Sequence, residues 1–381
     1  MTQTLPPYTM ISDADSLRWL AVELANEPLL AVDTESNSLH AYKERVCLVQ
    51  LSTREHDYII DPFEIEDMSP FGVLLADPKI EIILHAAEYD LMTLKRDYGF
   101  TVENLFDTLI AARIVGYESF GLAALLQEHF DVKPDKSHQR DNWGRRPLPP
   151  DSLAYAQMDT HYLPRLRDIL IDELNEMGRL AEAKELFIEA QDVPAADNST
   201  DYEGYWNLGR PKDLSRDQMA VLREVYLLRE ELAEEANSPT FKILSNQSLI
   251  EIARAKPTSL GALADVRSVG GGKVRRYGDD LLDAIERGLT GEHLPDEPPL
   301  PQPPDPVLAD RYVVLQQWRK EKGIERGVGS DVVMAKDVLW DLARTLPETM
   351  DELADTAGIG PERLRLYGDD LLDVLAGIRV G

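Results

Sequence analysis

Four acidic residues and one tyrosine have the types and the spacing that phosphoryl transfer requires. Asp33 and Glu35 lie in AVDTE, Asp90 lies in HAAEYD, and Tyr155 precedes Asp159 by four residues in YAQMD. Mg²⁺ takes oxygen ligands and usually combines one or two carboxylates with phosphate oxygens of a substrate. Two such ions about 3.5–4 Å apart can hold the attacking and the leaving oxygen of a displacement at phosphorus. The five residues therefore predict a site for two hard divalent cations, as in nucleases and polymerases.

The first pair of acids is expected at the end of a buried strand over residues 29–35. Side chains two residues apart on a strand point to the same face, so Asp33 and Glu35 are expected side by side. Two neighbouring carboxylates repel each other unless a positive charge lies between them, and a cation would remove this conflict. The alternative interpretation is a strand end at which both acids simply reach solvent.

The other acids are expected on helices. Asp90 is predicted near the start of a helix over residues 87–97, where its charge would also suit the helix dipole without any metal. Tyr155 and Asp159 are predicted on one face of a helix over residues 151–177, because positions i and i+4 are neighbours. The acid would hold an ion while the phenol positions the attacking water, and the alternative is a core tyrosine beside a solvated aspartate. The joint pattern favours chemistry, because four independent coincidences in this order would be a rare accident.

The elements that must position these residues form an α/β pattern over about the first 185 residues. Short apolar runs predict strands over residues 29–35, 46–53, 58–61 and 81–85. The first three strands follow one another closely, which predicts an antiparallel meander. Helical spacing and turn residues predict helices over 16–26, 87–97 ahead of Gly99, 105–115, 121–130 and 151–177, the last with Asp151 or Ser152 as N-cap. Strands that come first and then alternate with helices predict a mixed sheet with helices packed on it.

The C-terminal part contains an internal repeat with an offset of 90 residues. The string YGDDLLD occurs at 277–283 and again at 367–373, and LIEIAR at 249–254 corresponds to LWDLAR at 339–344. A period of this length indicates a duplicated helical domain rather than a solenoid. The segment 291–306 between the copies contains seven prolines. Such a tract favours an extended, semi-rigid linker.

In their order and spacing, the four acids and Tyr155 resemble the signature of the DEDD exonuclease superfamily, whose members have a ribonuclease H-like fold. The chain resembles the tyrosine subclass, because Ala154 stands where the histidine subclass has its histidine. Further strings resemble bacterial ribonuclease D over nearly the whole chain, namely LLAVDTES, VCLVQLST, ILHAAEYDLMTLKRDYG, LFDTLIAARIVG and RRPLPPDSLAYAQMDTHYL. Each copy of the repeat resembles the helicase-and-RNase-D C-terminal (HRDC) domain. One departure is Asp141-Asn142-Trp143, where that family usually has Asp directly before Trp.

The resemblance implies a role for each residue of the signature. Asp33, Glu35 and Asp159 would hold the ion that activates water. Asp33 would also bridge to a second ion, with Asp90 in the shell of that ion. Both ions would be Mg²⁺ or Mn²⁺, and Tyr155 would orient the attacking water.

A further group of residues is predicted to contact the substrate. Leu39 and Gln50 resemble positions near the terminal nucleotide in this superfamily, with ordinary packing as the alternative for Leu39. His85 is a candidate ligand or substrate contact, and a hydrogen-bonded structural histidine is the alternative. Basic groups around an aromatic ring can grip phosphate and stack a base. That pattern precedes the helix of Tyr155 and consists of Lys136, Arg140, Trp143, Arg145 and Arg146. A solvated loop with one anchoring tryptophan would explain the same residues.

The two helical copies differ in charge at one turn. The first has GGGKVRR, with Lys273, Arg275 and Arg276, whereas the second has GIGPERLR, with Glu362. A glycine-rich turn that leads into a helix can offer backbone N–H groups to phosphate. The first copy is therefore the better candidate for binding nucleic acid, and a plain turn between helices is the alternative.

Composition sets the remaining bounds. The formal net charge of −29 does not favour a polyanionic ligand, so binding of nucleic acid must depend on local basic patches and bound metal. A single cysteine, Cys47, excludes an intrachain disulfide and is consistent with a reducing cytoplasm. Neither a secretory signal nor a membrane-spanning apolar run is visible in the sequence. Walker, zinc-cluster and dinucleotide-binding motifs are also absent from it.

We therefore expect an α/β, ribonuclease H-like exonuclease domain with a mixed sheet, followed by two all-α HRDC-type domains. The expected boundaries are 1–195 for the exonuclease domain, 196–212 for a connector, 213–290 for the first helical domain, 291–306 for the proline-rich linker and 307–381 for the second helical domain.

The expected function is metal-dependent removal of nucleotides from the 3′ ends of structured RNA such as tRNA precursors, with release of nucleoside 5′-monophosphates. We expect the protein to bind RNA 3′ ends and to be a monomer. We expect neither an organic cofactor nor a membrane as a partner. One alternative is a DNA 3′–5′ exonuclease of the proofreading or helicase-associated type. RNA differs from DNA by its 2′-hydroxyl, and no residue can be assigned to reading that group. A non-catalytic scaffold that binds nucleic acid is the second alternative.

Overall fold

A computed structural model describes residues 5–208, 213–291, 294 and 305–380. These residues form two compact units. The first unit contains the described residues up to Glu35, the segment Val46–Ala196 and the residues from 305 onward. The second unit contains Ser36–Arg45 and the described residues from 197 to 294. The predicted linker 291–306 and the end of the predicted connector 196–212 lie largely outside the described residues, and the predicted domain boundaries stay predictions.

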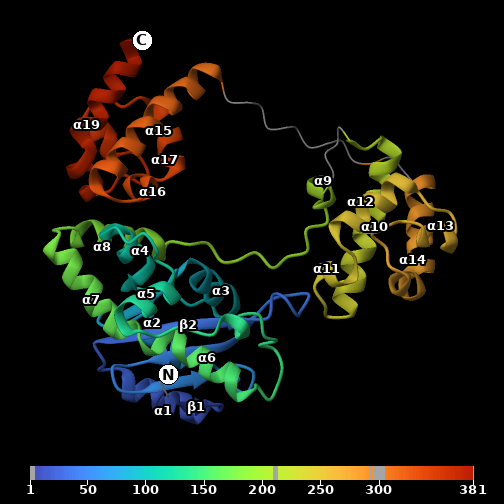
Figure 1. Ribbon diagram of the computed structural model, residues 1–381, viewed down its shortest axis with the longest axis horizontal. Helices are drawn as coiled ribbons and strands as arrows, with labels where there is room; N and C mark the ends of the chain where they lie inside the picture. The colour runs from blue at the N-terminus through green and yellow to red at the C-terminus, as the bar shows by residue number, and fades with distance from the viewer. Residues whose placement is uncertain (1–4, 209–212, 292–293, 295–304, 381) are drawn as a thin grey trace. The chain divides into compact units, whose positions relative to one another are not determined.

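The first unit contains one mixed sheet of six strands (Figure 1). Its spatial order is β1-β4-β3-β2-β5-β6. The strands are β1 (Thr9–Ile11), β2 (Leu29–Ser36), β3 (Val46–Ser52), β4 (Asp57–Ile60), β5 (Glu81–Leu84) and β6 (Leu105–Asp107). β3 pairs antiparallel with β4, whereas β1 pairs parallel with β4, and β5 pairs parallel with both β2 and β6. The mixed sheet expected from the sequence is confirmed.

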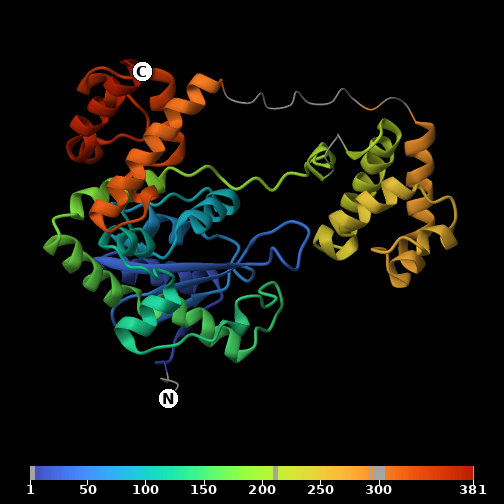
Figure 2. The same cartoon turned by 45° about the horizontal axis from the view of Figure 1, so that its top comes forward.

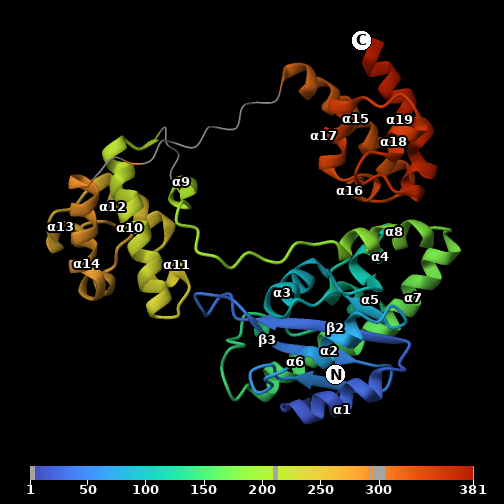
Figure 3. The ribbon, with the colours of Figure 1, turned by 180° about the vertical axis from the view of Figure 1, so that it is seen from behind.

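Helices lie on both sides of the strands, as Figures 1 and 3 show. Those that follow or separate the strands are α1 (Ala14–Leu24), α2 (Ser69–Leu75), α3 (Glu88–Tyr98), α4 (Thr108–Val115), α5 (Leu122–Phe130), α6 (Pro150–His161), α7 (Leu163–Glu176) and α8 (Leu180–Gln191). Leucines at positions 17, 20 and 24 of α1 are buried, as their helical spacing predicts. Buried leucine, isoleucine and valine side chains of the sheet and these helices form one continuous core.

Two predicted helices have different bounds in the structure. The helix expected over 105–115 begins only at Thr108, because Leu105–Asp107 pair with β5 and Asp107 caps α4 by accepting from the N–H of Leu109 at 2.8 Å. The helix expected over 151–177 is divided at Tyr162 into α6 and α7. Pro164, in the first turn of α7, has no N–H to donate to the preceding turn, and this missing hydrogen bond favours the break between the two helices.

The start of α6 also differs from its prediction. Pro149 is the N-cap and Pro150 is the first helical residue, so neither Asp151 nor Ser152 caps the helix. Proline suits this position because the first N–H of a helix has no intrahelical partner.

The C-terminal part consists of two helical copies, and Figure 2 shows each as a small bundle. The first contains α10 (Arg216–Glu235), α11 (Thr240–Ile243), α12 (Asn246–Ala255), α13 (Leu260–Ala264) and α14 (Gly271–Thr290). The second contains α15 (Pro306–Arg326), α16 (Ser330–Val333), α17 (Lys336–Thr345), α18 (Met350–Ala354) and α19 (Pro361–Val380). Each helix of the second copy starts 90 residues after its counterpart, so the repeat seen in the sequence is a repeat of structure. A short helix, α9 (Tyr205–Leu208), precedes the first copy.

Within the described residues, no helix combines the length and the apolar character that crossing a membrane requires.

Candidate active site

A cavity of about 400 Å³ lies where the carboxyl end of β2 meets α5 and α6. The burial pattern of β2 explains why its acids line this cavity. Residues 29–32 are buried in the core, and the strand becomes partly exposed from Asp33 onward. The cavity is lined by Asp33, Thr34, Glu35, His85, Gly121, Leu122, Ala123, Ala124, Pro134, Lys136, Gln139, Tyr155 and Asp159.

Three of the predicted acids converge in this cavity. Asp33 and Glu35 of β2 and Asp159 of α6 each place one carboxylate oxygen so that the three atoms all lie within 4.8 Å of one another. No lysine or arginine among the described residues forms an ion pair with any of the three. An all-oxygen donor set of this charge suits Mg²⁺ or Mn²⁺. The residues therefore fit the divalent metal that the fold implies.

The fourth acid, Asp90, is joined to the same strand through Thr34. Asp90 lies on α3 and is only 7% exposed, and its Oδ1 accepts from the Thr34 backbone N–H at 3.1 Å and from the Thr34 hydroxyl at 2.5 Å. These two bonds tie the start of α3 to the point where β2 enters the cavity. Asp90 is therefore next to the three-acid cluster but is not a member of it.

Burial and mutual repulsion shift the titration of all four acids in the absence of a metal. Burial, followed by the charges of the neighbouring acids, raises the pKa of Asp33 and of Glu35 well above their usual values. Burial raises the pKa of Asp90 to about 6, although its bonds from Thr34 oppose the rise. Burial also raises the pKa of Asp159 to about 7, against a hydrogen bond from Tyr155. A bound cation would favour the charged forms instead.

Tyr155 faces the cavity from α6, one turn before Asp159. Burial, followed by the charges of Asp159 and Glu35, raises the pKa of its phenol, so the hydroxyl stays protonated at neutral pH. The ring centroid of Trp143 lies 6.3 Å from that of Tyr155 in a small apolar cluster. The phenol is thus fixed on one side and open to the cavity on the other.

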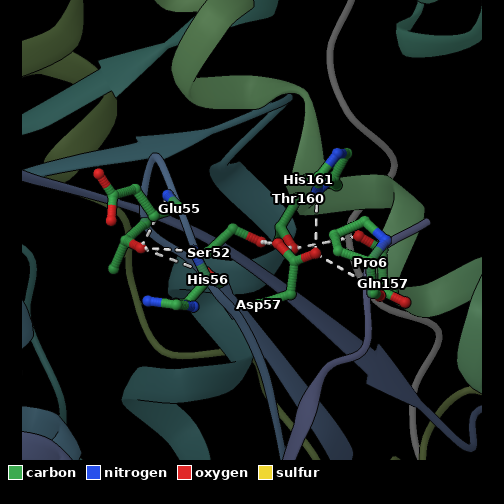
Figure 4. A network of polar contacts seen from close by, with 9 residues as sticks. Pro6, Ser52, Glu55, His56, Asp57, Gln157, Thr160 and His161 are labelled. Carbon is green, nitrogen blue, oxygen red and sulfur yellow. Dashed lines mark hydrogen bonds and ion pairs between the residues drawn. The ribbon is translucent and has the colours of Figure 1, made fainter.

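A polar network on the far side of α6 joins the helix to the sheet (Figure 4). The carboxylate of Asp57 on β4 accepts from Gln157 Nε2 at 2.6 Å, from His161 Nδ1 at 2.8 Å and from the Ser52 hydroxyl at 2.7 Å. A second contact joins the hydroxyls of Ser52 and Thr160 at 2.8 Å. Residues 157, 160 and 161 all belong to the helix that carries Tyr155 and Asp159, so this network sets its position.

The structure supports some of the predicted substrate contacts by their location. His85 and Lys136 both line the cavity. His85 also forms a hydrogen bond between Nδ1 and the Thr108 hydroxyl at 2.9 Å, so its predicted structural alternative applies as well. Arg140 and Arg145 are exposed, and their contacts with substrate stay predictions.

Two of the predicted contacts are wrong. Trp143 is 1% exposed and packs in the protein interior, so no base can stack on it. The Arg146 guanidinium donates to both oxygens of Asp61, at 2.5 and 2.7 Å, and to the backbone carbonyl of Cys47 at 2.7 Å. This arginine anchors the loop before α6, and its donors are not available to a phosphate.

The remaining predicted contacts lie away from the lining of the cavity. Gln50 is fully buried in β3 and is not a lining residue. Leu39 is 41% exposed and belongs to the second unit, so its contact stays a prediction. Lys273 and Arg276 line a different cavity in the first helical copy, and Arg275 is exposed nearby.

Thr34 and Asp57 have positioning contacts that the sequence did not reveal, and the start of α5 lines the cavity without having been predicted to do so. Thr34 stands between Asp33 and Glu35, and both its backbone N–H and its hydroxyl donate to Asp90. The pair Gln157 and His161 at i, i+4 could have indicated a polar face on α6. The partner of that face, Asp57, is 100 residues away from Gln157 and cannot be found from spacing.

This fold and this site define a class of protein, the 3′–5′ exonucleases that use divalent metal. A family model described as a 3′–5′ exonuclease matches residues 8–175, and the HRDC domain model matches residues 218–285 and 309–375. The chain belongs to the ribonuclease D family, and it is a 3′–5′ exoribonuclease that acts on nucleic acid. Ribonuclease D of Granulibacter bethesdensis is 32% identical over 380 residues, which cover 98% of this chain and 93% of that protein.

Other relatives and solved structures agree with this assignment. Ribonuclease D of Pseudomonas paraeruginosa is 30% identical over 385 residues, covering 98% of this chain and 99% of that protein. The crystal structure of Escherichia coli RNase D matches with a TM-score of 0.67 at 26% identity, over 98% of this chain and 99% of that chain. The catalytic core of RRP6 from Trypanosoma brucei matches with a TM-score of 0.65 at 28% identity, over 76% of this chain and 81% of that chain.

Proposed function

We propose that the enzyme shortens structured RNA from its 3′ end with two divalent ions, Mg²⁺ or Mn²⁺, in the cavity at the end of β2. The convergence of the Asp33, Glu35 and Asp159 carboxylates within 4.8 Å is the observation that carries this proposal. Each cycle would break the bond from phosphorus to the 3′ oxygen of the penultimate nucleotide and release a nucleoside 5′-monophosphate.

Each residue of the cavity would have a distinct task. Asp33, Glu35 and Asp159 would hold one ion, and Asp33 would share a second ion with Asp90. When bound, the ions would supply positive charge to the oxygens at which negative charge develops. The Tyr155 hydroxyl would orient the attacking water, and its raised pKa keeps the phenol neutral beside the acids. Lys136, which lines the cavity, would contact a phosphate of the substrate.

Structured RNA is the proposed substrate class. Escherichia coli RNase D is described as an exoribonuclease involved in structured RNA processing. We extend the proposal to the 3′ ends of tRNA precursors, as one kind of structured RNA, and to a monomer that works in the cytoplasm.

Hydrolysis of an end-labelled RNA hairpin with a single-stranded 3′ tail would test this proposal. Wild-type protein should shorten the 5′-labelled strand nucleotide by nucleotide with Mg²⁺ or Mn²⁺, and EDTA should abolish the reaction. Asp33→Asn and Asp159→Asn should each lower kcat by about 10²–10³-fold, because a charge-stabilising group is lost. Tyr155→Phe should lower kcat by about 10²-fold while the metal concentration for half-maximal activity is kept.

Asp151→Asn provides a matched control, because Asp151 is exposed on the same helix as Asp159 and does not line the cavity. This variant should retain wild-type activity. Full activity of folded Asp33→Asn or Asp159→Asn would refute the assignment of the site. A matched DNA strand should be degraded more slowly than the RNA, and the opposite preference would support the DNA exonuclease alternative.

A further inference from the structure

The loop between β2 and β3 begins at the candidate active site and belongs to the second unit. The segment Ser36–Arg45 is part of that unit, although the two strands that it joins are neighbours in the sheet of the first. A loop between neighbouring strands usually needs only about two to five residues, so this loop is longer than the connection requires. It begins directly after Glu35, one of the three acids that converge in the cavity. Whatever holds this loop therefore acts on the strand end that carries Glu35.

Tyr42 fixes the loop within the second unit. Its side chain packs against the apolar core of that unit. Its hydroxyl lies 3.0 Å from the Thr200 hydroxyl and donates to Glu230 Oε2 of α10 at 3.3 Å. Its backbone N–H donates to Asn237 Oδ1 at 3.3 Å. Tyr42 is thus held by the segment before α10, by α10 itself and by the turn that follows this helix.

A second anchor lies where the loop returns to the sheet. The Asn198 side-chain amide of the second unit donates to the Glu44 carbonyl at 2.8 Å. At the start of β3, the Val46 N–H donates to Asp97 Oδ2 at 2.7 Å, near the end of α3. Because α3 also carries Asp90, both ends of the loop continue into contacts with elements that carry acids of the site.

Hydrogen bonds across its neck make the loop a stiff connection. The Ser36 hydroxyl donates to Glu44 Oε1 at 2.5 Å, and the Arg45 N–H donates to Asn37 Oδ1 at 2.9 Å. Asn37 is buried, and its carbonyl accepts from two further backbone N–H groups of the loop. A loop that is joined to itself in this way moves largely as one body, so a displacement of its tip reaches the end of β2.

The end of β2 needs such an anchor because its pairing with β5 stops early. The residues of β2 that pair with β5 end at Ala31. Beyond that point, on the α3 side, the Thr34 N–H and hydroxyl donate to Asp90. Mg²⁺ demands near-ideal octahedral geometry, so a small shift of the Glu35 carboxylate would weaken the ion's site.

We propose that Tyr42 is a positioning residue for the exonuclease reaction. By anchoring the loop in the core of the second unit, Tyr42 holds the end of β2 so that the Glu35 carboxylate stays in the metal site. The active site thus depends on a tyrosine that neither lines the cavity nor belongs to the unit that contains it. This inference rests on the proposed function, because it takes Glu35 as a ligand of a divalent ion.

Tyr42→Ala in the full chain removes the anchor and leaves every residue of the cavity in place. Hydrogen–deuterium exchange in EDTA, read by mass spectrometry, would follow the amides of residues 33–36. Their exchange should become about fivefold faster or more, because the loop no longer restrains the strand end. Titration calorimetry with Mn²⁺ should give a Kd about tenfold higher, the smaller end of the loss that follows when an orienting contact of a metal ligand is removed.

The rate of RNA hydrolysis separates positioning from a loss of folded enzyme. At limiting Mn²⁺, Tyr42→Ala should be about tenfold slower than wild type, because less of the enzyme holds its metal. Saturating Mn²⁺ should restore most of the rate. A smaller fraction of folded protein would instead lower the rate equally at both metal concentrations, and that result would overturn the proposal.

Two further variants control for a general loosening of the second unit. Asn237→Gly removes the acceptor of the Tyr42 N–H without changing the loop, and glycine suits the φ of 40° at this position. It should shift exchange and Mn²⁺ affinity in the same direction as Tyr42→Ala. Tyr42→Phe and Tyr226→Phe form a matched pair, because the Tyr226 hydroxyl also bonds to a residue before α10, donating to the Asp201 carbonyl at 2.7 Å. Only the change at Tyr42 should speed exchange of residues 33–36.

The outcomes separate the proposal from the function on which it rests. Wild-type exchange and Mn²⁺ affinity in folded Tyr42→Ala and Asn237→Gly would overturn it, as would equal effects of Tyr42→Phe and Tyr226→Phe. Faster exchange of residues 33–36 in Tyr42→Ala supports the link from Tyr42 to β2, even if wild-type protein neither binds Mn²⁺ nor hydrolyses RNA. In that last case the proposed function fails and the positioning of the strand end by Tyr42 stands.

Discussion

Burial disfavours the ionised form of the Asp159 carboxyl group, and a bound cation would favour that form. Burial raises its pKa to about 7, whereas an ordinary aspartate is ionised well below that pH. In the metal-free protein, the folded state therefore binds this proton more tightly than the unfolded chain does. The stability from that proton is fully present below about pH 4 and is lost as the pH rises through about 7.

Thermal unfolding between pH 5 and pH 8 would reveal this linkage. In EDTA, the Tm of wild-type protein should fall as the pH rises, and it should fall less in Asp159→Asn, which has no carboxyl group to ionise. A difference of several degrees is expected, because 1 kcal/mol corresponds to about 2–4 °C for a domain of this size. With Mn²⁺ present the trend should reverse for wild type, since metal ligands must be deprotonated. An equal fall in both proteins would contradict the assigned pKa.

At this scale, the sequence was sufficient for residues whose roles follow from local spacing. The two-residue period of a strand predicted that Asp33 and Glu35 share a face, and the i, i+4 relation did the same for Tyr155 and Asp159. Trp143 and Arg146 were misinterpreted for a physical reason. A basic and aromatic loop has the same sequence pattern whether its side chains face a ligand or the core. Only tertiary contacts decide, here the ion pair of Arg146 with Asp61 and the apolar packing of Trp143.

The helix α6 is the element on which the site depends most. It carries Tyr155 and Asp159 on the cavity side, and its opposite side is fixed to β4 through Asp57. Although burial alone would raise the pKa of Asp57, the hydrogen bonds from His161, Ser52 and Gln157 lower it overall. The carboxylate is therefore ionised at neutral pH and accepts bonds that determine the height of α6 above the sheet.

Asp57→Ala should loosen this helix and slow the reaction. Three donors would lose their acceptor, and two of them, Ser52 and Gln157, are buried, so the free energy of unfolding should drop by about 2–3 kcal/mol. The same change should lower kcat by about tenfold, since a small displacement of a positioned group has large effects on rate. Urea unfolding and single-nucleotide release would measure the two quantities.

Asp168→Ala is a suitable comparison, because Asp168 on α7 forms an exposed ion pair with Arg54 of the loop between β3 and β4. Its stability change should stay below about 1 kcal/mol, with kcat unchanged. An Asp57→Ala variant that loses stability but keeps wild-type kcat would show that the network has no role in positioning.

Elements with long periodic patterns were predictable, and short ones were not. β2, β3 and α1 have apolar residues at consistent spacing, and their bounds are close to those expected. β1 and β6 have three residues each, which is too short for any period to be visible. Their strand conformation comes from pairing with β4 and β5, and the sequence does not encode that pairing locally.

On the scale of the whole molecule, the second helical copy and the exonuclease domain share one compact unit. Arg326 donates to both oxygens of Glu182 on α8, at 2.7 and 2.6 Å, and to the hydroxyl of Tyr367. The side chains of Arg326 and Glu182 are 15% and 3% exposed, so water screens this pair weakly. The repeat itself was visible in the sequence, but this contact was not, because equivalent surfaces of the two copies carry different residues.

A double-mutant cycle with Glu182→Gln and Arg326→Met would measure the coupling across this contact. Either single variant should lose about 3–5 kcal/mol, because it leaves a buried polar partner uncompensated. The double variant should recover part of that loss. The coupling free energy should reach about 1.5–3 kcal/mol by chemical unfolding.

The exposed pair Arg344 and Asp341 on α17 serves as the reference cycle. Its coupling should be below about 1 kcal/mol. Equal coupling in the two cycles would mean that the second copy is not held to α8 by this ion pair.

The constant offset between the helical copies has a consequence for how such a chain can change. Because each helix starts 90 positions from its counterpart, a genetic crossover between matching positions would preserve every helix. Unequal recombination would then yield enzymes with one or three modules instead of two. Chimaeras made in this way would join the first helices of one module to the last helices of the other without any redesign of the junction.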